Sequence, residues 1–354
     1  MLKKENFTSE HIQKVRERTK TDPTIIERAI FAFGLLEALV RTGAEFVFKG
    51  GSSLMLLLDK PMRLSTDIDI IVARDYEIEP FIDEAAKIYP FVSKEEIVRR
   101  GANKIVKKHY KFYYSSLSTP DRTVPILLDV LFEENHYATI IQKEIKTGFL
   151  EVEGAPTYVS IPSVNSLLGD KLTAFAPNTS GIRYTTQKGD DIVVDKKTEV
   201  IKQFFDIASL FDKADDFMAI KNSYIATVQA EIAYRDVDLT YKDCLQDSFN
   251  CALGIFSRGK LFPNEYANLL DGIKRIRSFL MNVRFDGETA YTQAAKVMLL
   301  CAGIMTDTDI LKEVPTINEK LEAPYNKINF MQKIDEPAFN MARYAIYLTK
   351  KIIF

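Results

Sequence analysis

Two short blocks in the first quarter of the chain constrain its fold more than any other feature. In the first, the β-favouring run Glu45–Lys49 meets Gly50-Gly51 and then a helix-forming stretch from Ser52 to Asp59, which predicts a strand, a sharp turn and a helix. In the second, the apolar run Ile68–Val72, entered at about Thr66, predicts another strand. A helix between two strands so close in sequence indicates an α/β sheet here.

The glycine-serine turn has the features of an anion site. A helix that begins at Gly50-Gly51 presents backbone N–H groups, and its dipole favours negative charge there. Glycine lets a phosphate approach the backbone closely, and the hydroxyls of Ser52 and Ser53 add donors. The alternative is a tight turn that binds nothing, because a glycine pair alone is weak evidence.

Asp67 and Asp69 lie two residues apart where the second strand begins. On a strand such residues point to the same side, roughly 6.5–7 Å apart along the chain. This spacing suits two oxygen ligands for a pair of divalent cations about 3.5–4 Å apart, and magnesium prefers a few carboxylates together with substrate phosphates. The alternative is a pair of acids at a solvated strand end.

Two further residues are candidates for the same site. Asp129 is the only acid in the apolar run Pro125–Phe132, and a neighbouring cation would offset the cost of burying its carboxylate. The alternative is an edge-strand aspartate that faces water. Arg63, together with Ser65, lies just before the acidic pair, where it can steady a phosphate or form an ordinary surface salt bridge.

The order of predicted elements indicates an α+β protein. Asp22 and Pro23 begin a helix, and Lys104–Ser115 with Val124–Glu133 form an antiparallel hairpin around the turn Ser118–Asp121. Further predicted elements are a short strand at Tyr158–Ile161 and helices at Glu77–Tyr89, Ser163–Phe175, Glu199–Lys213, Phe217–Ala233, Tyr241–Phe256, Asn264–Met281, Gly287–Ile304 and near Pro337–Ile352, with a polar loop from Asn178 to about Asp191. We therefore expect an α/β domain with N-terminal helices at residues 1–162 and a helical domain at 163–354.

Composition excludes several classes of protein. The net charge of −2 excludes a bulk polycation, so any RNA contact needs a local basic face. One candidate is Lys104–Tyr114, whose mixed basic and aromatic residues fit either RNA binding or a strand with one wet face. Three cysteines outside any CxxC pair argue against a disulfide framework or a zinc site. No apolar run reaches the length of a membrane span, so we expect a cytoplasmic protein.

The glycine-serine turn followed by Asp-x-Asp resembles the DNA polymerase β-like nucleotidyltransferase superfamily. More narrowly, the blocks Lys49–Leu54 and Arg63–Asp69 resemble the AbiEii/AbiGii (MenT-like) toxins of type IV toxin–antitoxin and abortive-infection systems. The resemblance continues with a lysine and an aspartate on later helices, at Lys171 and Asp206. It covers roughly residues 45–213. The spacer before Asp67 is slightly long for the superfamily, and serine stands where threonine is frequent.

The resemblance implies a mixed twisted sheet flanked by helices, and a magnesium-dependent transfer of NMP from an NTP. Two ions would be held by Asp67, Asp69 and Asp129. Lys171 would contact the nucleotide triphosphate or the transition state, and Asp206 would orient Lys171 or a substrate hydroxyl. The alternative for both residues is a solvated helix charge. The implied acceptor is the 3′ end of a tRNA, and the implied regulator is a cognate antitoxin. The alternatives are a protein or small-molecule acceptor such as an aminoglycoside, or a nucleotide-binding module without turnover.

Overall fold

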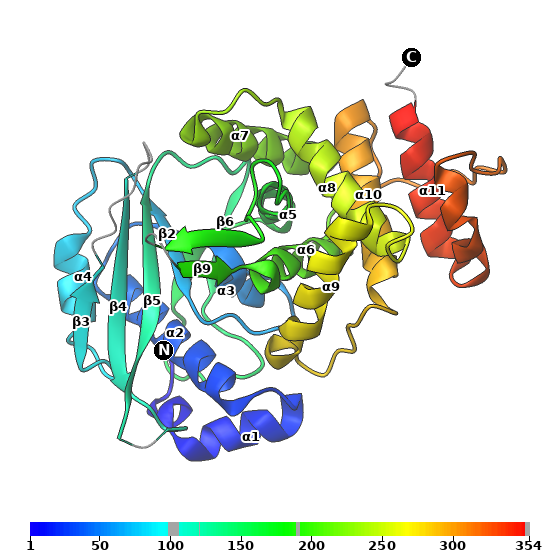
Figure 1. Ribbon diagram of the computed structural model, residues 1–354. Helices are drawn as coiled ribbons and strands as arrows, with labels where there is room; N and C mark the ends of the chain where they lie inside the picture. Colours follow the sequence, from blue (N-terminus) through cyan, green and yellow to red (C-terminus); the bar gives the residue numbers. More distant parts are fainter. Residues whose placement is uncertain (98–105, 120, 189–191, 351–354) are drawn as a thin grey trace. The chain divides into compact units, whose positions relative to one another are not determined.

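The computed structural model describes residues 1–97, 106–119, 121–188 and 192–350. These residues divide into two compact units, which are considered separately (Figure 1). Unit 1 comprises Met1–Ser163 and the short segment Ser278–Val283. Unit 2 comprises Val164–Arg277 and Arg284–Phe354. Among the described residues, no helix combines the length and the apolar character that a membrane crossing needs.

Unit 1 is built on a seven-stranded mixed sheet with the strand order β3-β4-β5-β2-β1-β7-β6. The strands are β1 (Val47–Lys49), β2 (Ile68–Val72), β3 (Ser93–Glu96), β4 (Lys107–Ser115), β5 (Thr123–Phe132), β6 (Ile140–Glu144) and β7 (Tyr158–Pro162). The helices are η1 (Lys4–Phe7), α1 (Ser9–Thr19), α2 (Pro23–Arg41), α3 (Gly50–Leu57) and α4 (Glu79–Ala85). The predicted hairpin is confirmed, since β4 and β5 pair antiparallel, and the mixed sheet with helices is the one expected of the α+β fold.

The two faces of this sheet differ sharply in burial. On one face Ile70, Leu128 and Phe112 are fully buried, and α2 packs against this side, where Phe31 stacks on Tyr114 with ring centroids 3.8 Å apart. The alternate residues of β5 point to the other face, and they are only partly buried. Because side chains alternate along a strand, each polar residue of this second face lies between core residues of the first.

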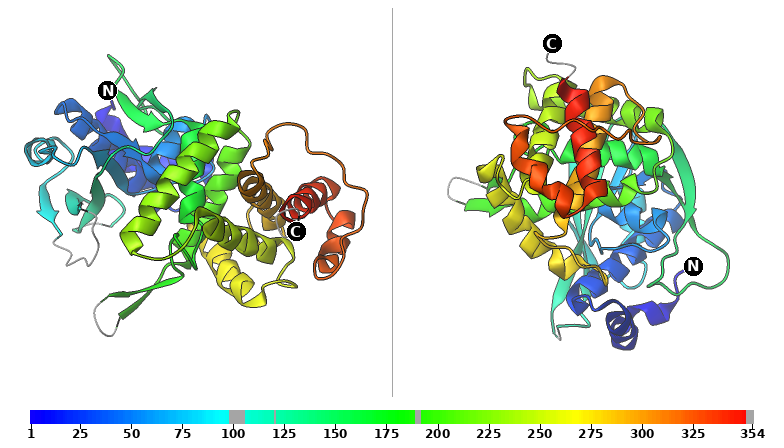
Figure 2. Two further views of the ribbon diagram at one scale, coloured as in Figure 1. Left: turned by 90° about the horizontal axis from the view of Figure 1, so that it is seen from above. Right: turned by 90° about the vertical axis from the view of Figure 1, so that its right-hand side faces the viewer.

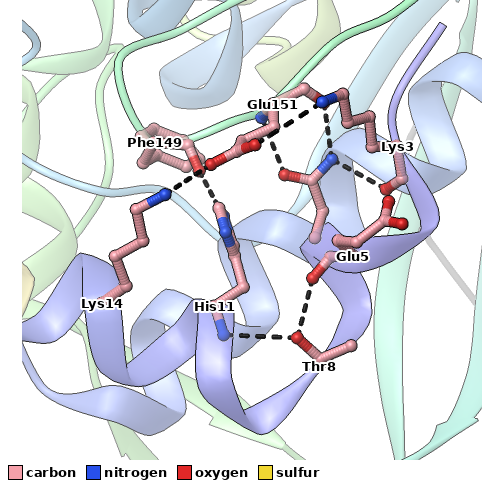
Figure 3. Close-up of polar contacts among 8 residues, drawn as sticks. Lys3, Glu5, Thr8, His11, Lys14, Phe149 and Glu151 are labelled. Atoms are coloured by element: carbon pink, nitrogen blue, oxygen red, sulfur yellow. Dashed lines mark hydrogen bonds and ion pairs between the residues drawn. The ribbon is translucent and has the colours of Figure 1, made fainter.

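Hydrogen bonds and ion pairs join the N-terminal segment to the loop that follows β6 (Figure 3). Lys14 on α1 pairs with Glu151 at 2.6 Å, and the buried His11 ring contacts the Phe149 carbonyl at 2.9 Å. Thr8 caps α1 by accepting the His11 N–H at 3.2 Å. The fully buried Asn6 donates to the Glu151 carbonyl and accepts its N–H. The N-terminal helices are therefore an integral part of unit 1.

The segment Ser278–Val283 completes unit 1 from far along the chain. Its backbone bonds to the loop before β2, because Leu64 donates to the Phe279 carbonyl and Met281 donates to the Met62 carbonyl, both at 2.8 Å. Thr21 adds a side-chain bond to the Leu280 carbonyl at 2.9 Å. These bonds hold the residues on either side of Arg63.

Unit 2 is mainly helical. Its helices are α5 (Val164–Ala174), α6 (Lys197–Phe211), α7 (Phe217–Arg235), α8 (Tyr241–Phe256), α9 (Pro263–Arg275), α10 (Ala290–Thr306), η3 (Tyr325–Lys333) and α11 (Glu336–Lys350). The short helix η2 (Ile276–Phe279) follows α9, and its last two residues belong to unit 1. Within the unit, α5 packs against α6 and α7, and α10 packs against α8 and α11. Figure 2 shows α11, in red, beside α10.

Several predicted boundaries are wrong in instructive ways. Gly50-Gly51 is not a separate turn, because α3 begins at Gly50 itself. The predicted polar loop from Asn178 contains a hairpin, formed by β8 (Thr185–Lys188) and β9 (Ile192–Asp195), and residues 189–191 lie outside the described residues. The single helix predicted over Asn264–Met281 ends at Arg275 and continues as the tighter η2. The strands β3 and β6 were not predicted.

Candidate functional site

Four polar residues lie in one row across four neighbouring strands of unit 1. Asp69 on β2 has Asp129 on β5 as its lateral partner on one side and Lys49 on β1 as its partner on the other. Asp129 in turn has His109 on β4 as its partner. Laterally paired residues point to the same face of a sheet, so this row lies on the partly open face. The pairing brings together Asp69 and Asp129, two residues 60 positions apart in sequence.

The start of α3 lies directly against Asp69. Gly50 has a positive φ of 79°, and a β-carbon added there would collide with the Asp69 carboxylate. A β-carbon at Gly51 would lie 2.7 Å from Nη2 of Arg63 and 2.9 Å from Oγ of Ser65. At Gly50 the positive φ and the Asp69 carboxylate both favour glycine, whereas at Gly51 the ends of the Arg63 and Ser65 side chains would have to shift to admit a β-carbon. The first residues of α3 therefore lie beside the carboxylate of Asp69 and the guanidinium of Arg63.

Arg63 is not a surface residue. It is only 3% exposed, so the alternative of an ordinary surface salt bridge is wrong. Its Nη1 donates to the Leu64 carbonyl at 3.0 Å, and its Nη2 lies beside the β-position of Gly51. A buried guanidinium at the start of a helix strengthens the local preference for an anion.

The hydroxyls of Ser52 and Ser53 both donate hydrogen bonds to backbone carbonyls. Both residues are fully buried. Ser52 donates to the Asp67 carbonyl at 2.5 Å, and Ser53 donates to the Gly50 carbonyl at 3.0 Å. Each hydroxyl has one proton, so binding a phosphate through it would require exchanging these bonds. The Ser52 bond also fixes Asp67 relative to α3, which links the two sequence blocks. Phosphate binding by Ser52 and Ser53 remains a prediction.

Asp67 lies directly before β2 and is held by side chains. Arg28 on α2 approaches its Oδ1 at 3.5 Å, and Thr66 donates to the same atom at 3.3 Å. The Asp67 side chain is 48% exposed, so the pair with Arg28 is well hydrated and contributes little to stability. The carboxylate is accessible to a ligand from solvent.

His109 was not among the predicted site residues, yet it contacts one of them. Its Nδ1 lies 2.7 Å from Oδ1 of Asp129. A signal was present in the sequence, because counting ten residues in each direction from Thr119, in the predicted turn, reaches positions 109 and 129. The register confirms that pairing.

The basic and aromatic segment around His109 is a strand with two different faces. Tyr110, Phe112 and Tyr114 are buried in the core, and burial raises the pKa of Tyr110 to about 12. On the other face Tyr113 donates to Glu95 at 2.6 Å, and this bond lowers the pKa of Glu95. Buried rings are unable to stack on bases, so the strand alternative accounts for the described part of Lys104–Tyr114; residues 104 and 105 lie outside it.

Unit 2 brings Lys171 on α5 and Asp206 on α6 into an ion pair. Lys171 Nζ lies 3.1 Å from Oδ2 of Asp206 and donates to Oε1 of Gln203 at 3.0 Å. Lys171 is 4% exposed and Asp206 is fully buried, so neither is the solvated helix charge of the alternative. The catalytic roles implied for them remain predictions.

The predicted magnesium ligands fit the ion in chemistry. Carboxylate oxygens are the donors that magnesium prefers, and Asp69 and Asp129 are lateral neighbours. However, within the described ranges no group of three or more His, Cys, Asp or Glu residues is arranged to hold a metal ion. Magnesium therefore belongs to the proposal below.

A separate cleft of about 790 Å³ lies at the other ends of β1 and β2. Its walls include Val47, Val72, Ser160 and the buried Glu133. None of the predicted site residues lines it. The glycine-aspartate site and this cleft are distinct features of unit 1.

The mixed sheet, the glycine-started helix and the paired aspartates define a nucleotidyltransferase type of domain. The family model for the nucleotidyl transferase AbiEii toxin of type IV toxin–antitoxin systems matches residues 34–288, and the chain belongs to this family. Membership makes the chain a nucleotidyltransferase, with an NTP as substrate, and implies a cognate antitoxin. A search of curated proteins finds no match to the chain.

Proposed function

We propose that this toxin-family nucleotidyltransferase transfers an NMP from an NTP to the 3′ end of a tRNA and releases pyrophosphate. The observation that carries the proposal is the lateral pairing of Asp69 with Asp129, beside the helix start at Gly50. A carboxylate pair and an anion-binding helix start are the two parts that this chemistry needs. The tRNA acceptor rests on the family resemblance.

Each residue of the candidate site in unit 1 has its own role in this reaction. Backbone N–H groups at the start of α3, with the Arg63 guanidinium, bind the β- and γ-phosphates. The acceptor hydroxyl oxygen bonds to the α-phosphorus, the bond from that phosphorus to the bridging oxygen breaks, and pyrophosphate leaves. Since His109 engages Oδ1 of Asp129, Oδ2 takes the hydroxyl proton. Magnesium, when held by Asp67, Asp69 and Asp129, supplies positive charge to the triphosphate.

Labelled nucleotides test this proposal directly. The purified chain is incubated with each α-labelled NTP, magnesium and total tRNA, and transfer is read on a gel. We expect labelled tRNA, and no label from γ-labelled NTP because that phosphate leaves. The variants Asp69→Asn and Asp129→Asn should each lose about a hundredfold or more in rate, since both remove charge from the reacting centre.

Asp75→Asn is the matched control. Asp75 lines the separate cleft, so removing its charge should leave the rate of nucleotide transfer unchanged. Equal labelling by wild type and Asp69→Asn would refute the proposed mechanism. Label on protein or on a small molecule would replace the tRNA acceptor and keep the chemistry. NTP binding without pyrophosphate release would favour the module without turnover.

A further inference from the structure

The hydrogen bond between His109 and Asp129 joins the largely buried His109 side chain to the more exposed Asp129 side chain. The His109 side chain is 11% exposed, whereas that of Asp129 is 44% exposed. Nδ1 and Oδ1 are 2.7 Å apart, a distance typical of a bond to a charged group. When the Asp129 carboxylate is ionised it only accepts hydrogen bonds, and the donor is then the Nδ1–H tautomer of His109.

The backbone of His109 is held from both sides. Along one edge β4 pairs with β5 through nine consecutive residue pairs, from Lys107 to Ser115. Along the other edge Ile97 donates to the His109 carbonyl at 2.7 Å. A ring on such a backbone, with little exposed surface, has few alternative positions. The Asp129 carboxylate, bonded to it, is restricted to the matching rotamer.

We propose that His109 is a positioning residue, which orients the Asp129 carboxylate toward Asp69 for ion binding. This inference rests on the proposed function, because it assigns a role to a neighbour of a proposed ligand. His109 acts through Asp129 and touches neither the nucleotide nor the acceptor. Residues that orient metal ligands in this way commonly change metal affinity or activity by about 10- to 100-fold when they are removed.

The competing interpretation is that the bond only stabilises the β4–β5 hairpin. A purely structural bond would change thermal stability and leave ion binding of the folded protein unaltered. A positioning bond would weaken ion binding and lower kcat, with the KM for the acceptor unchanged. The two interpretations therefore differ in a measurement that does not depend on turnover.

Mn²⁺ binding to the full-length chain, followed by electron paramagnetic resonance, provides that measurement. His109→Leu removes the donor, whereas His109→Asn keeps an amide N–H at about the distance of Nδ1 from the backbone. We expect His109→Leu to bind Mn²⁺ about 10- to 100-fold more weakly and His109→Asn to recover most of the wild-type affinity. His136→Asn is the matched control, since His136 lies 3.9 Å from Glu133, away from the row. Thermal denaturation verifies that each variant is folded.

A folded His109→Leu variant with wild-type Mn²⁺ affinity would overturn the inference. So would a wild-type chain that binds no Mn²⁺. Equal losses in His109→Leu and His109→Asn would also contradict it, because the retained donor should rescue binding. Failure of the proposed function would be seen separately, as a wild-type chain that binds Mn²⁺ and labels no acceptor. In that case the comparison of variants still decides the role of His109.

Discussion

Gly50 and Asp69 touch so closely that a β-carbon on the first would overlap the carboxylate of the second. Two requirements therefore coincide at Gly50. Its positive φ of 79° favours glycine, and the Asp69 side chain occupies the space that any other residue would fill. The glycine thus sets the position of an acid that lies 19 residues later in the sequence.

Gly50→Ala should abolish nucleotide transfer, because Asp69 must move. Gly43→Ala is a matched control, since Gly43 has a similar φ of 84° with no atom near its β-position. Both variants should lose about 1–2 kcal/mol of stability through backbone strain, and only Gly50→Ala should also lose transfer. Chemical denaturation and the labelling assay measure the two effects. Comparable activity in the two variants would contradict the proposed role of this contact.

Lys171→Ala should destabilise the protein severely. The substitution leaves Asp206 buried, with 0% exposure, without the ammonium that lies 3.1 Å away. Breaking a buried ion pair in this way costs about 3–5 kcal/mol. Urea denaturation measures the loss, and Lys213→Ala, an exposed lysine just after α6, should change stability little. A Lys171→Ala variant as stable as wild type would show that the pair is dispensable for folding.

Asn6→Ala should loosen the N-terminal segment. Asn6 is fully buried, and its amide bonds to the carbonyls of Lys3 and Glu151 and to the Glu151 N–H. Removing it leaves buried backbone groups without this partner, at a cost of about 2 kcal/mol. Thermal denaturation measures the change. Gln13→Ala, on the exposed side of α1, is the control, and an equal effect in both variants would refute the prediction.

The start of α8 should contribute stability that depends on pH. The Thr240 hydroxyl and N–H donate to Asp243 and lower the pKa of that carboxyl below its ordinary value of 3.8. The folded state therefore favours the ionised form, and the contribution is present above 3.8 and is lost as the pH falls through the lowered pKa.

Asp243→Ala should cost about 0.5–1 kcal/mol at neutral pH, because it removes the Asp243 half of the capping box and keeps Thr240 as the cap. The difference in melting temperature from wild type should shrink well below pH 3.8. Asp238→Ala, in the exposed loop before the helix, corrects for the removal of a charge. A difference from that control that stays constant with pH would contradict the assignment.

The elements with strong local signals were predicted from sequence almost to the residue. The helix α8 (Tyr241–Phe256) has the predicted bounds, and β2 (Ile68–Val72) ends where predicted but begins two residues after the expected start at about Thr66, so that Asp67 lies outside it. At α2 the Asp22 side chain accepts the Thr24 N–H, as expected of a cap before Pro23. In each case the determinant lies within the element itself, as a periodic pattern or a capping residue.

The features that were missed depend on distant residues. The strand β3 has the sequence Ser-Lys-Glu-Glu, which carries no β signal and pairs because β4 lies beside it. The row that contains His109 follows from strand register, which is a property of the whole sheet. The contacts of Arg63 with Gly51, and the burial of Lys171, likewise require the fold. The sequence predicts the candidate residues of the site, but it carries little information on the contacts that hold them.

The position of the six residues Ser278–Val283 in the sequence limits how the gene can recombine. They complete unit 1 through bonds to Met62 and Leu64, although more than a hundred positions of unit 2 separate them from Ser163. A recombination event that exchanged everything after Ser163 for a foreign sequence would remove the backbone partners on either side of the buried arginine. The two parts of the gene are therefore expected to be transmitted together, and a toxin of this kind should diversify by substitution more readily than by shuffling.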